Sequence, residues 1–98
     1  MESVDMGVTI RLVGVLKITT GIEEIKLDSE ENDTIETILG RLVEMYPTLR
    51  PELYTKTGEI HKYLNIFLDN KPVLEKNLND ISIQKSATLT LVMAVGGG

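Results

Sequence analysis

The sequence predicts an α+β fold, in which a mixed sheet of four to five strands carries one main helix on one face. Two observations predict it. Apolar and polar residues alternate along segments near both ends of the chain, which is typical of half-buried strands. Between these segments, apolar residues recur at helical spacing over positions 35–46 and form a single stripe. A helix with one apolar stripe and a sheet with one apolar face can bury each other.

The first two strands are predicted over residues 8–16 and 22–27. Their inward-facing side chains are Val8, Ile10 and Leu12 in the first strand, and Ile25 and Leu27 in the second. The Thr-Thr-Gly sequence at 19–21 has turn chemistry, so the two strands predict an antiparallel hairpin. Because this turn is not a tight Asn-Gly type, the register of the hairpin stays open.

The helix is the clearest periodic signal in the chain. Asp33, followed three residues later by Glu36, is expected to start it as an N-cap in a capping box. Pro47 is expected to end it, because the residue before a proline is pushed out of the helical region. Gly40, inside the helix, is interpreted as allowing a close approach to the sheet, or as a tolerated imperfection. The apolar stripe consists of Ile35, Ile38, Leu39, Leu42, Val43 and Tyr46.

The second half of the chain predicts a short helical turn near 52–54, a strand over 63–69, a short edge strand with an irregular loop over 72–83, and a last strand over 87–94. The side chains expected on the core face are Leu64, Ile66 and Leu68, and then Leu89, Leu91 and Met93. The first and last strands are expected to be neighbours at the centre of the sheet. This arrangement is a β-grasp, or ubiquitin-like, roll.

Length and composition allow one domain with an ordinary core. The chain has 98 residues, 42% of them hydrophobic and 26% charged, and no cysteine. We expect a loose lead-in at 1–7, the domain at 8–94 and a glycine-rich tail at 95–98. The absence of cysteine excludes disulfides and thiolate metal sites, and His61 is the single histidine, so no metal site is expected.

Charge and hydropathy restrict the partners that the sequence predicts. The net charge of -5 argues against nucleic acid, which requires a basic face. No apolar run is long enough to cross a bilayer, and no basic-then-apolar leader follows Met1, so no membrane association and a cytoplasmic location are expected.

The last seven residues, Val-Met-Ala-Val-Gly-Gly-Gly, lead an apolar strand directly into glycines. Glycine has no Cβ, so such a tail is thin and can enter a narrow channel in which a side chain would clash. The functional interpretation is that the Gly98 carboxylate is the reactive group. The alternative is that the glycines are a loose end without a role, since short glycine runs are common in linkers.

The predicted roll together with its Gly-Gly end resembles the ubiquitin-like sulfur-carrier family. That family includes the small subunit of molybdopterin synthase, the thiamin sulfur carrier and the archaeal small modifiers. The similarity extends over residues 8–98 and is strongest at Tyr-Leu-Asn-Ile-Phe-Leu-Asp-Asn-Lys-Pro (63–72) and at the tail. Family tails commonly read Pro-Pro-Val-small-Gly-Gly. Here Val95, Gly96, Gly97 and Gly98 match, while Met93 and Ala94 replace the prolines.

The resemblance implies a specific chemistry. An E1-like adenylyltransferase would use ATP to convert the Gly98 carboxylate into an acyl-adenylate, and no cofactor would be bound by this chain itself. Persulfide sulfur from a sulfur donor protein would then displace AMP and leave a C-terminal thiocarboxylate. With the large subunit of molybdopterin synthase, the chain would deliver that sulfur during molybdenum cofactor biosynthesis. It would be the sulfur-carrying subunit of a synthase and not a self-sufficient enzyme.

Partner contacts are predicted at the tail and on the sheet. Phe67, the single phenylalanine, should face away from the core beside Val92 and mark a docking surface. The alternative is that a second layer, formed by residues 47–62, covers Phe67. The predicted partner-binding residues are Gly97, Gly96, Val95, Ala94, Met93, Phe67 and Val92.

Two other functions stay open. In the first, the chain is a protein modifier joined through Gly98 to lysines of target proteins, with Lys56 or Lys71 as possible acceptors on the chain itself. In the second, it is a non-catalytic β-grasp binding module whose glycine tail has no role. No paired carboxylates, phosphate-binding glycine loop or nucleophile–base pair precede the tail.

Overall fold

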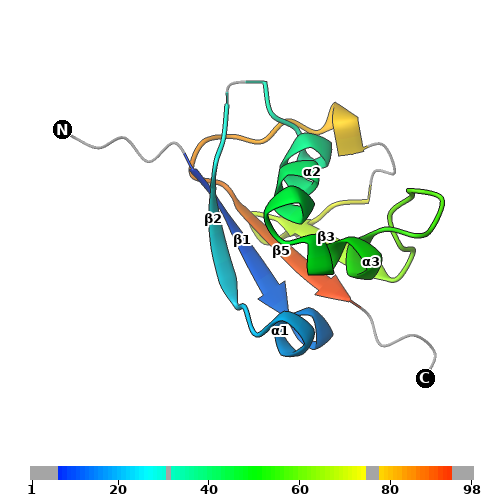
Figure 1. Ribbon diagram of the computed structural model, residues 1–98. Coiled ribbons are helices and arrows are strands. Elements are labelled where there is room, and N and C mark those ends of the chain that lie inside the picture. The colour runs from blue at the N-terminus through cyan, green and yellow to red at the C-terminus, as the bar shows by residue number, and fades with distance from the viewer. Residues whose placement is uncertain (1–6, 31, 75–77, 94–98) are drawn as a thin grey trace.

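The computed structural model describes residues 7–30, 32–74 and 78–93. Figure 1 shows one sheet with its helices on one side. In chain order, the elements are β1 (Gly7–Val13), α1 (Val15–Thr20), β2 (Glu24–Asp28), α2 (Ile35–Met45), the 3-10 turn η1 (Pro47–Leu49), α3 (Arg50–Leu53), β3 (Leu64–Leu68), β4 (Lys71–Pro72), the 3-10 turn η2 (Leu78–Asp80) and β5 (Thr88–Met93).

The described strands form one mixed sheet in the order β2-β1-β5-β3-β4. β1 and β5 are parallel neighbours at the centre, with Ile10 opposite Leu89, and β5 is antiparallel to β3. β1 and β2 are antiparallel, and the pairing of Val8 with Leu27 gives the register that the sequence left open. The predicted fold class and the central pairing of the first and last strands are therefore confirmed.

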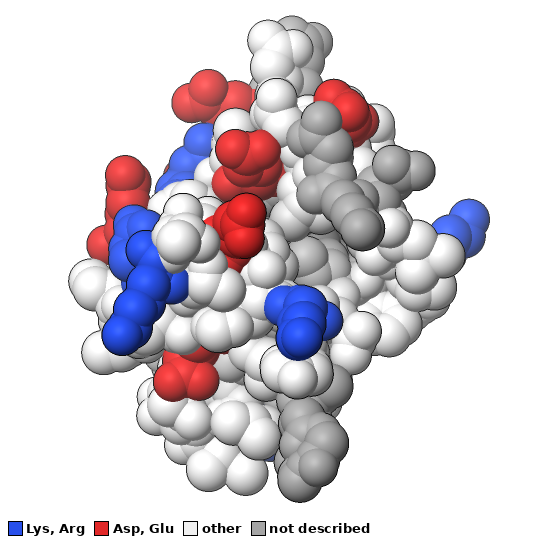
Figure 2. Space-filling view, turned by 90° about the vertical axis from the view of Figure 1, so that its right-hand side faces the viewer, with Lys and Arg blue, Asp and Glu red and all other residues white. Residues whose placement is uncertain are grey.

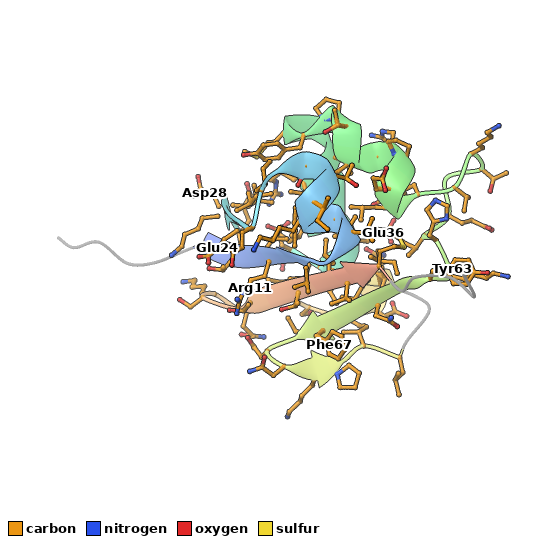
Figure 3. The ribbon with its side chains drawn as sticks, turned by 90° about the horizontal axis from the view of Figure 1, so that it is seen from below. Arg11, Glu24, Asp28, Glu36, Tyr63 and Phe67 are labelled. Atoms are coloured by element: carbon orange, nitrogen blue, oxygen red, sulfur yellow. The ribbon has the colours of Figure 1, made fainter. Side chains whose placement is uncertain are left out.

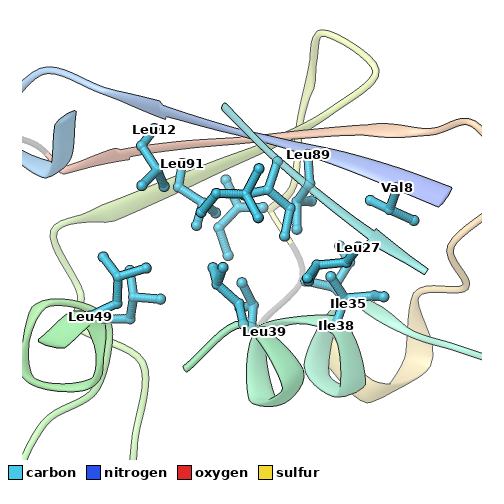
Figure 4. Packing of buried hydrophobic residues seen from close by; sticks show 14 of the residues in the cluster. Val8, Leu12, Leu27, Ile35, Ile38, Leu39, Leu49, Leu89 and Leu91 are labelled. Carbon is cyan, nitrogen blue, oxygen red and sulfur yellow. The ribbon is translucent and has the colours of Figure 1, made fainter. Parts of the chain in front are cut away.

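The core lies between the sheet and α2, as the close view in Figure 4 shows. Five of the six predicted stripe residues of α2 are fully or almost fully buried, and the sixth, Tyr46, packs partly buried against them. The helix ends at Met45, before Pro47, as predicted. The buried sheet residues are Val8, Ile10, Leu12, Ile25, Leu27, Leu64, Ile66, Leu89 and Leu91, while Leu68 and Met93 pack partly buried against them.

The prediction of a continuous strand over residues 8–16 was wrong. β1 ends at Val13, and Gly14, with φ 68°, turns the chain into the six-residue helix α1. Leu16 is fully buried in the core from this helix. Gly21, which was expected in a strand-to-strand turn, ends α1 in the left-handed conformation and donates its N–H to the Lys17 carbonyl. Burial of Leu16 thus outweighs the strand propensity of the neighbouring valine, isoleucine and threonine residues.

The predicted capping box of α2 was displaced by one residue. Thr34 is the N-cap, and it exchanges two hydrogen bonds with Thr37, at 3.3 Å from the Thr37 N–H to Thr34 Oγ1 and 2.8 Å from the Thr34 N–H to Thr37 Oγ1. Asp33 instead accepts two hydrogen bonds from Arg41, at 2.9 and 3.1 Å, and one from the Glu30 N–H at 2.7 Å. Glu36 takes no part in the cap.

The β3–β4 connection is a two-residue hairpin turn in which Asp69 and Asn70 both have positive φ, 50° and 71°. Asp69 also links the turn to β5, because its Oδ1 accepts the Thr88 N–H at 2.9 Å. Positive φ at both central residues is typical of type I′ turns, in which glycine is preferred at the second position.

Replacement of Asn70 by glycine is therefore expected to raise the free energy of unfolding, by about 0.5 to 1 kcal/mol, since glycine adopts positive φ without a Cβ clash. Urea denaturation of both chains measures the difference. The matched variant Asn65→Gly, in the middle of β3, should instead be less stable than the parent chain. Equal losses of unfolding free energy in Asn70→Gly and Asn65→Gly would contradict the prediction that the positive φ of Asn70 is unfavourable for asparagine.

Candidate functional site

The tail follows the central strand of the sheet, β5. β5 is hydrogen-bonded to β1 on one edge and to β3 on the other. Near its end, Val92 lies opposite Val13 of β1 and Asn65 of β3, and Met93 lies opposite Leu64. The point from which the tail leaves is thus held by strands on both sides.

Five of the predicted site residues, Ala94, Val95, Gly96, Gly97 and Gly98, lie outside the described residues. Their roles, including that of the Gly98 carboxylate, stay predictions. The same holds for the boundary between the predicted domain and the tail.

Phe67 and Val92 lie on the same face of the sheet, as predicted. Phe67 is opposite Thr90, and Val92 is opposite Asn65, so the two are diagonal neighbours on adjacent strands. Figure 3 shows Phe67 on the side of the sheet away from the helices. Phe67 and Val92 are both partly exposed.

The predicted alternative, in which residues 47–62 cover Phe67, was wrong. Leu49 and Leu53 of that segment are fully buried in the core, and Tyr54 and Ile60 pack against it. The segment therefore covers the helix side of the sheet. Phe67 lies on the opposite face, and its contact with a partner stays a prediction.

Asp33, Arg41 and Tyr54, in the described part of the chain, have shifted pKa values, and each shift has a structural cause. The hydrogen bonds from Arg41 lower the pKa of Asp33 to about 2, against the opposing effect of burial. Burial raises the pKa of Tyr54. Asp33 also accepts the Thr37 hydroxyl at 2.9 Å, and Arg50 Cζ lies 5.9 Å from the centre of the Tyr54 ring, so both groups make contacts within the fold.

Two clefts on the described surface lie beside α2 and at the β3–β4 edge. One, of about 400 Å³, lies beside α2 and is lined by Gly40, Arg50 and Tyr54, among others. A Cβ at Gly40 would have nothing within 4 Å, so the interpretation that Gly40 allows a close approach to the sheet was wrong. The other cleft, of about 700 Å³, lies at the β3–β4 edge, with His61 and Lys62 on its rim.

No group of three or more histidine and acidic side chains is placed to hold a metal ion among the described residues. None of the helices in the described ranges is both long and apolar enough to cross a membrane. Figure 2 shows acidic and basic side chains interspersed over one face, without a continuous basic patch. The expectation that the chain binds no nucleic acid stays a prediction.

Sequence reasoning missed α1, which packs against β5, the strand that precedes the tail in the sequence. One signal in the sequence could have revealed it. Gly14 interrupts the alternating pattern, and Gly21 stands where a helix C-terminal glycine is expected. Two glycines seven positions apart, around an apolar residue, are compatible with a short helix.

Solved structures share this fold. The chain superposes on the small archaeal modifier protein SAMP1 from Haloferax volcanii with a TM-score of 0.83 and 21% sequence identity, covering 94% of this chain and 99% of that one. It matches the putative molybdopterin converting factor, subunit 1, from Pyrococcus furiosus with a TM-score of 0.68 and 12% identity, covering 92% and 99%. It matches CysO from Mycobacterium tuberculosis with a TM-score of 0.69 and 22% identity, covering 90% and 99%.

No protein-family model and no curated protein sequence matches the chain. The structural likeness nevertheless covers 99% of each of these three solved chains, so the described fold is the ubiquitin-like roll. The β-grasp fold that the sequence predicted is confirmed, and it is shared with a small archaeal modifier protein and a putative molybdopterin converting factor subunit.

Proposed function

We propose that this chain is a ubiquitin-like sulfur carrier whose reactive group is the Gly98 carboxylate. One observation carries the proposal. The central strand β5, paired on both edges, ends at Met93 and continues directly into a segment that finishes in three glycines. A rigid support followed by a segment whose last three residues have no side chains is suited to present its end to the active site of another protein. The described residues contain no reactive constellation that would serve a different chemistry.

The reaction follows from the chemistry of a carboxylate. Because a carboxylate is a poor electrophile, an E1-like adenylyltransferase would transfer AMP from ATP to it and release pyrophosphate. The terminal sulfur of a donor protein's persulfide would then attack the acyl carbon, and AMP would leave. A thiol would reduce the resulting acyl disulfide, releasing the thiocarboxylate and a new disulfide. The partner's site supplies positioning and electrostatic stabilisation.

The destination of the sulfur is molybdopterin in this proposal, with the chain as the small subunit of a molybdopterin synthase. The match to the Pyrococcus furiosus protein, whose name is that of a molybdopterin converting factor subunit, supports this destination. The outer sheet face around Phe67 and Val92 would contact the large subunit.

A second candidate is a protein modifier, joined through Gly98 to lysines of target proteins. It is favoured by the match to a small archaeal modifier protein, whose TM-score of 0.83 exceeds that of the converting factor, 0.68. Both functions require the same adenylated intermediate. They differ in the nucleophile that accepts the acyl group, which is sulfur in one and a lysine amine in the other.

Intact mass spectrometry of the chain purified from its own cells distinguishes these functions. A sulfur carrier is expected to show a fraction whose mass corresponds to replacement of one terminal oxygen by sulfur. A modifier is expected to appear covalently attached to other proteins through Gly98. The proposal would be contradicted if the chain purified from its own cells had only an unmodified terminus, and if the terminus also stayed unmodified after incubation with the adenylyltransferase, ATP and a sulfur donor.

A further inference from the structure

Exposed hydrophobic side chains gather at one end of the described molecule. This end is where β1 and β5 finish, as Figure 1 shows, and where β3 begins, because β3 is antiparallel to β5. The turn η1, which follows α2, contacts α1 at this end. Six large hydrophobic residues are exposed within the described ranges, and five of them belong to this end, the exception being Leu74. We name these five the apolar collar: Val13, Val15, Ile18, Met45 and Tyr63.

The collar surrounds the position at which the tail leaves. Val13 lies opposite Val92 on the neighbouring strand, and Tyr63 immediately precedes Leu64, the partner of Met93. α1 contacts both β5 and the turn η1 that follows Met45. Because β1 and β5 are parallel, their carboxyl ends lie side by side at one end of the sheet. The helix α1, which follows β1, therefore lies at that end too.

Within α1, Val15 and Ile18 are three residues apart, so their side chains lie on the same face of the helix. Leu16 is buried in the core, whereas Ile18 is 82% exposed. A single exposed apolar residue is ordinary. Several of them at one end of a molecule indicate an interaction surface.

Charged groups border the collar. Lys17 and Glu23, at the two sides of the α1 turn, form an exposed ion pair at 3.4 Å, and the Lys62 ammonium lies 5.4 Å from the centre of the Tyr63 ring. An apolar centre with a charged rim is the usual composition of a protein–protein interface. This arrangement fits a protein partner of similar composition.

The length of the tail determines which partner reaches the collar, if Gly98 is the reactive end as proposed above. Residues 94–98, fully extended, span at most about 18 Å. An enzyme that activates Gly98 must place its reacting groups within that distance of Met93. A surface that encloses the tail therefore rests against this end of the molecule.

We propose that the apolar collar is the docking surface for the adenylating enzyme, and that apolar residues around the entrance of that enzyme's active site cover it. The inference rests on the proposed function and adds the surface that the enzyme recognises. Contact there would remove water from the path along which the tail enters. Exclusion of water protects a reactive acyl-adenylate from hydrolysis.

The test is ATP–pyrophosphate exchange, catalysed by the purified E1-like adenylyltransferase of the same organism, with the full chain as substrate. Replacement of Ile18 by aspartate is expected to raise the KM for the chain by about tenfold or more, because a charge would be buried in an apolar contact. The kcat should stay within about twofold, because the substitution affects binding and not the reacting groups. Ile18→Ser, which adds no charge, should raise the KM in the same direction by a smaller factor.

Leu74→Asp is the matched control. Leu74 is 85% exposed, follows the edge strand β4 and lies outside the collar, and the substitution makes the same change of charge. Its KM is expected to equal that of the parent chain within about twofold. Thermal unfolding of each variant checks that the fold is retained.

The outcomes separate the inference from the proposed function. If the parent chain supports no exchange, the proposed function fails and the inference fails with it. If the parent chain is adenylated and Ile18→Asp has the parental KM, the collar inference alone is overturned. Equal increases in KM for Ile18→Asp and Leu74→Asp would show general charge repulsion and would also overturn it.

Discussion

Removal of Gly97 and Gly98 is expected to abolish adenylation of the chain, with a loss of kcat/KM in ATP–pyrophosphate exchange of more than about 100-fold. Each residue of an extended chain spans roughly 3.5 Å, so the shorter chain ends about 7 Å before the position that the enzyme requires. β5 cannot compensate for this loss by sliding, because its register is held by β1 and by β3. A slide by two residues, which would recover the lost length, would put Ala87 in the place of the buried Leu89 and leave the core underfilled.

A chain of full length whose terminus is a carboxamide tests the same point without a change in length. It is expected to be as inactive as the shortened chain, because an amide oxygen does not attack the α-phosphate of ATP as a carboxylate does. Deletion of two residues at the other end, Glu2 and Ser3, is the matched control and should leave exchange unaffected. Full exchange activity of the shortened chain would show that the terminal carboxylate of Gly98 has no special role.

Replacement of Asp33 by asparagine is expected to lower the free energy of unfolding by about 2 to 3 kcal/mol at pH 7. The Asp33 side chain is 7% exposed and binds Arg41 through both of its oxygens. Arg41 also donates to the Asp28 carbonyl at 2.9 Å, so the pair links the end of β2 to the start of α2. The pKa of Asp33 falls from 3.8 to about 2, and each pH unit corresponds to about 1.4 kcal/mol.

The sign of the pH dependence follows from this shift. Because the pKa of Asp33 is lower in the folded state than in the unfolded state, its contribution to stability is complete above about pH 5 and is lost as the pH falls through about 2. The difference in unfolding free energy between the parent chain and Asp33→Asn should therefore shrink between pH 5 and 2. Urea denaturation at pH 7, 4 and 2 measures it.

Glu44→Gln is the control for Asp33→Asn, since Glu44 is an exposed acid on the same helix and removal of its charge should change the free energy of unfolding by less than about 0.5 kcal/mol. A difference between the parent chain and Asp33→Asn that is the same at pH 7 and pH 2 would exclude the ion pair as its origin.

The long periodic elements could be predicted from the sequence because the spacing of their apolar residues indicates which side chains are buried. The apolar stripe of α2 and the alternation in β5 each satisfy one periodicity, and the structure buries the predicted residues. A single stripe needs a single apolar face, which predicted one sheet packed against one helix. The first and last strands were expected at the centre of that sheet, where the structure places them. Phe67 was placed on the outer face by the same alternation.

Short-range features were less predictable. Val13, Val15 and Ile18 are β-branched, so residues 13–18 favour a strand by propensity. The burial of Leu16 in the core favours the helix instead, which Gly14 and Gly21 bound. Asp33 and Thr34 are both suitable N-cap residues. The choice between them depends on Arg41, eight positions from Asp33, whose guanidinium binds the aspartate and leaves the cap to threonine.

By itself, the sequence determined the fold class, the buried faces of α2 and the main strands, and the glycine tail on which the proposed function depends, because hydrophobic periodicity and the absence of side chains are local properties. The tertiary structure alone decided the helix α1, the pairing of Asp33 with Arg41 and the apolar collar. These depend on which segments become neighbours, since the parallel alignment of β1 with β5 brings residues from distant parts of the chain to one end of the molecule.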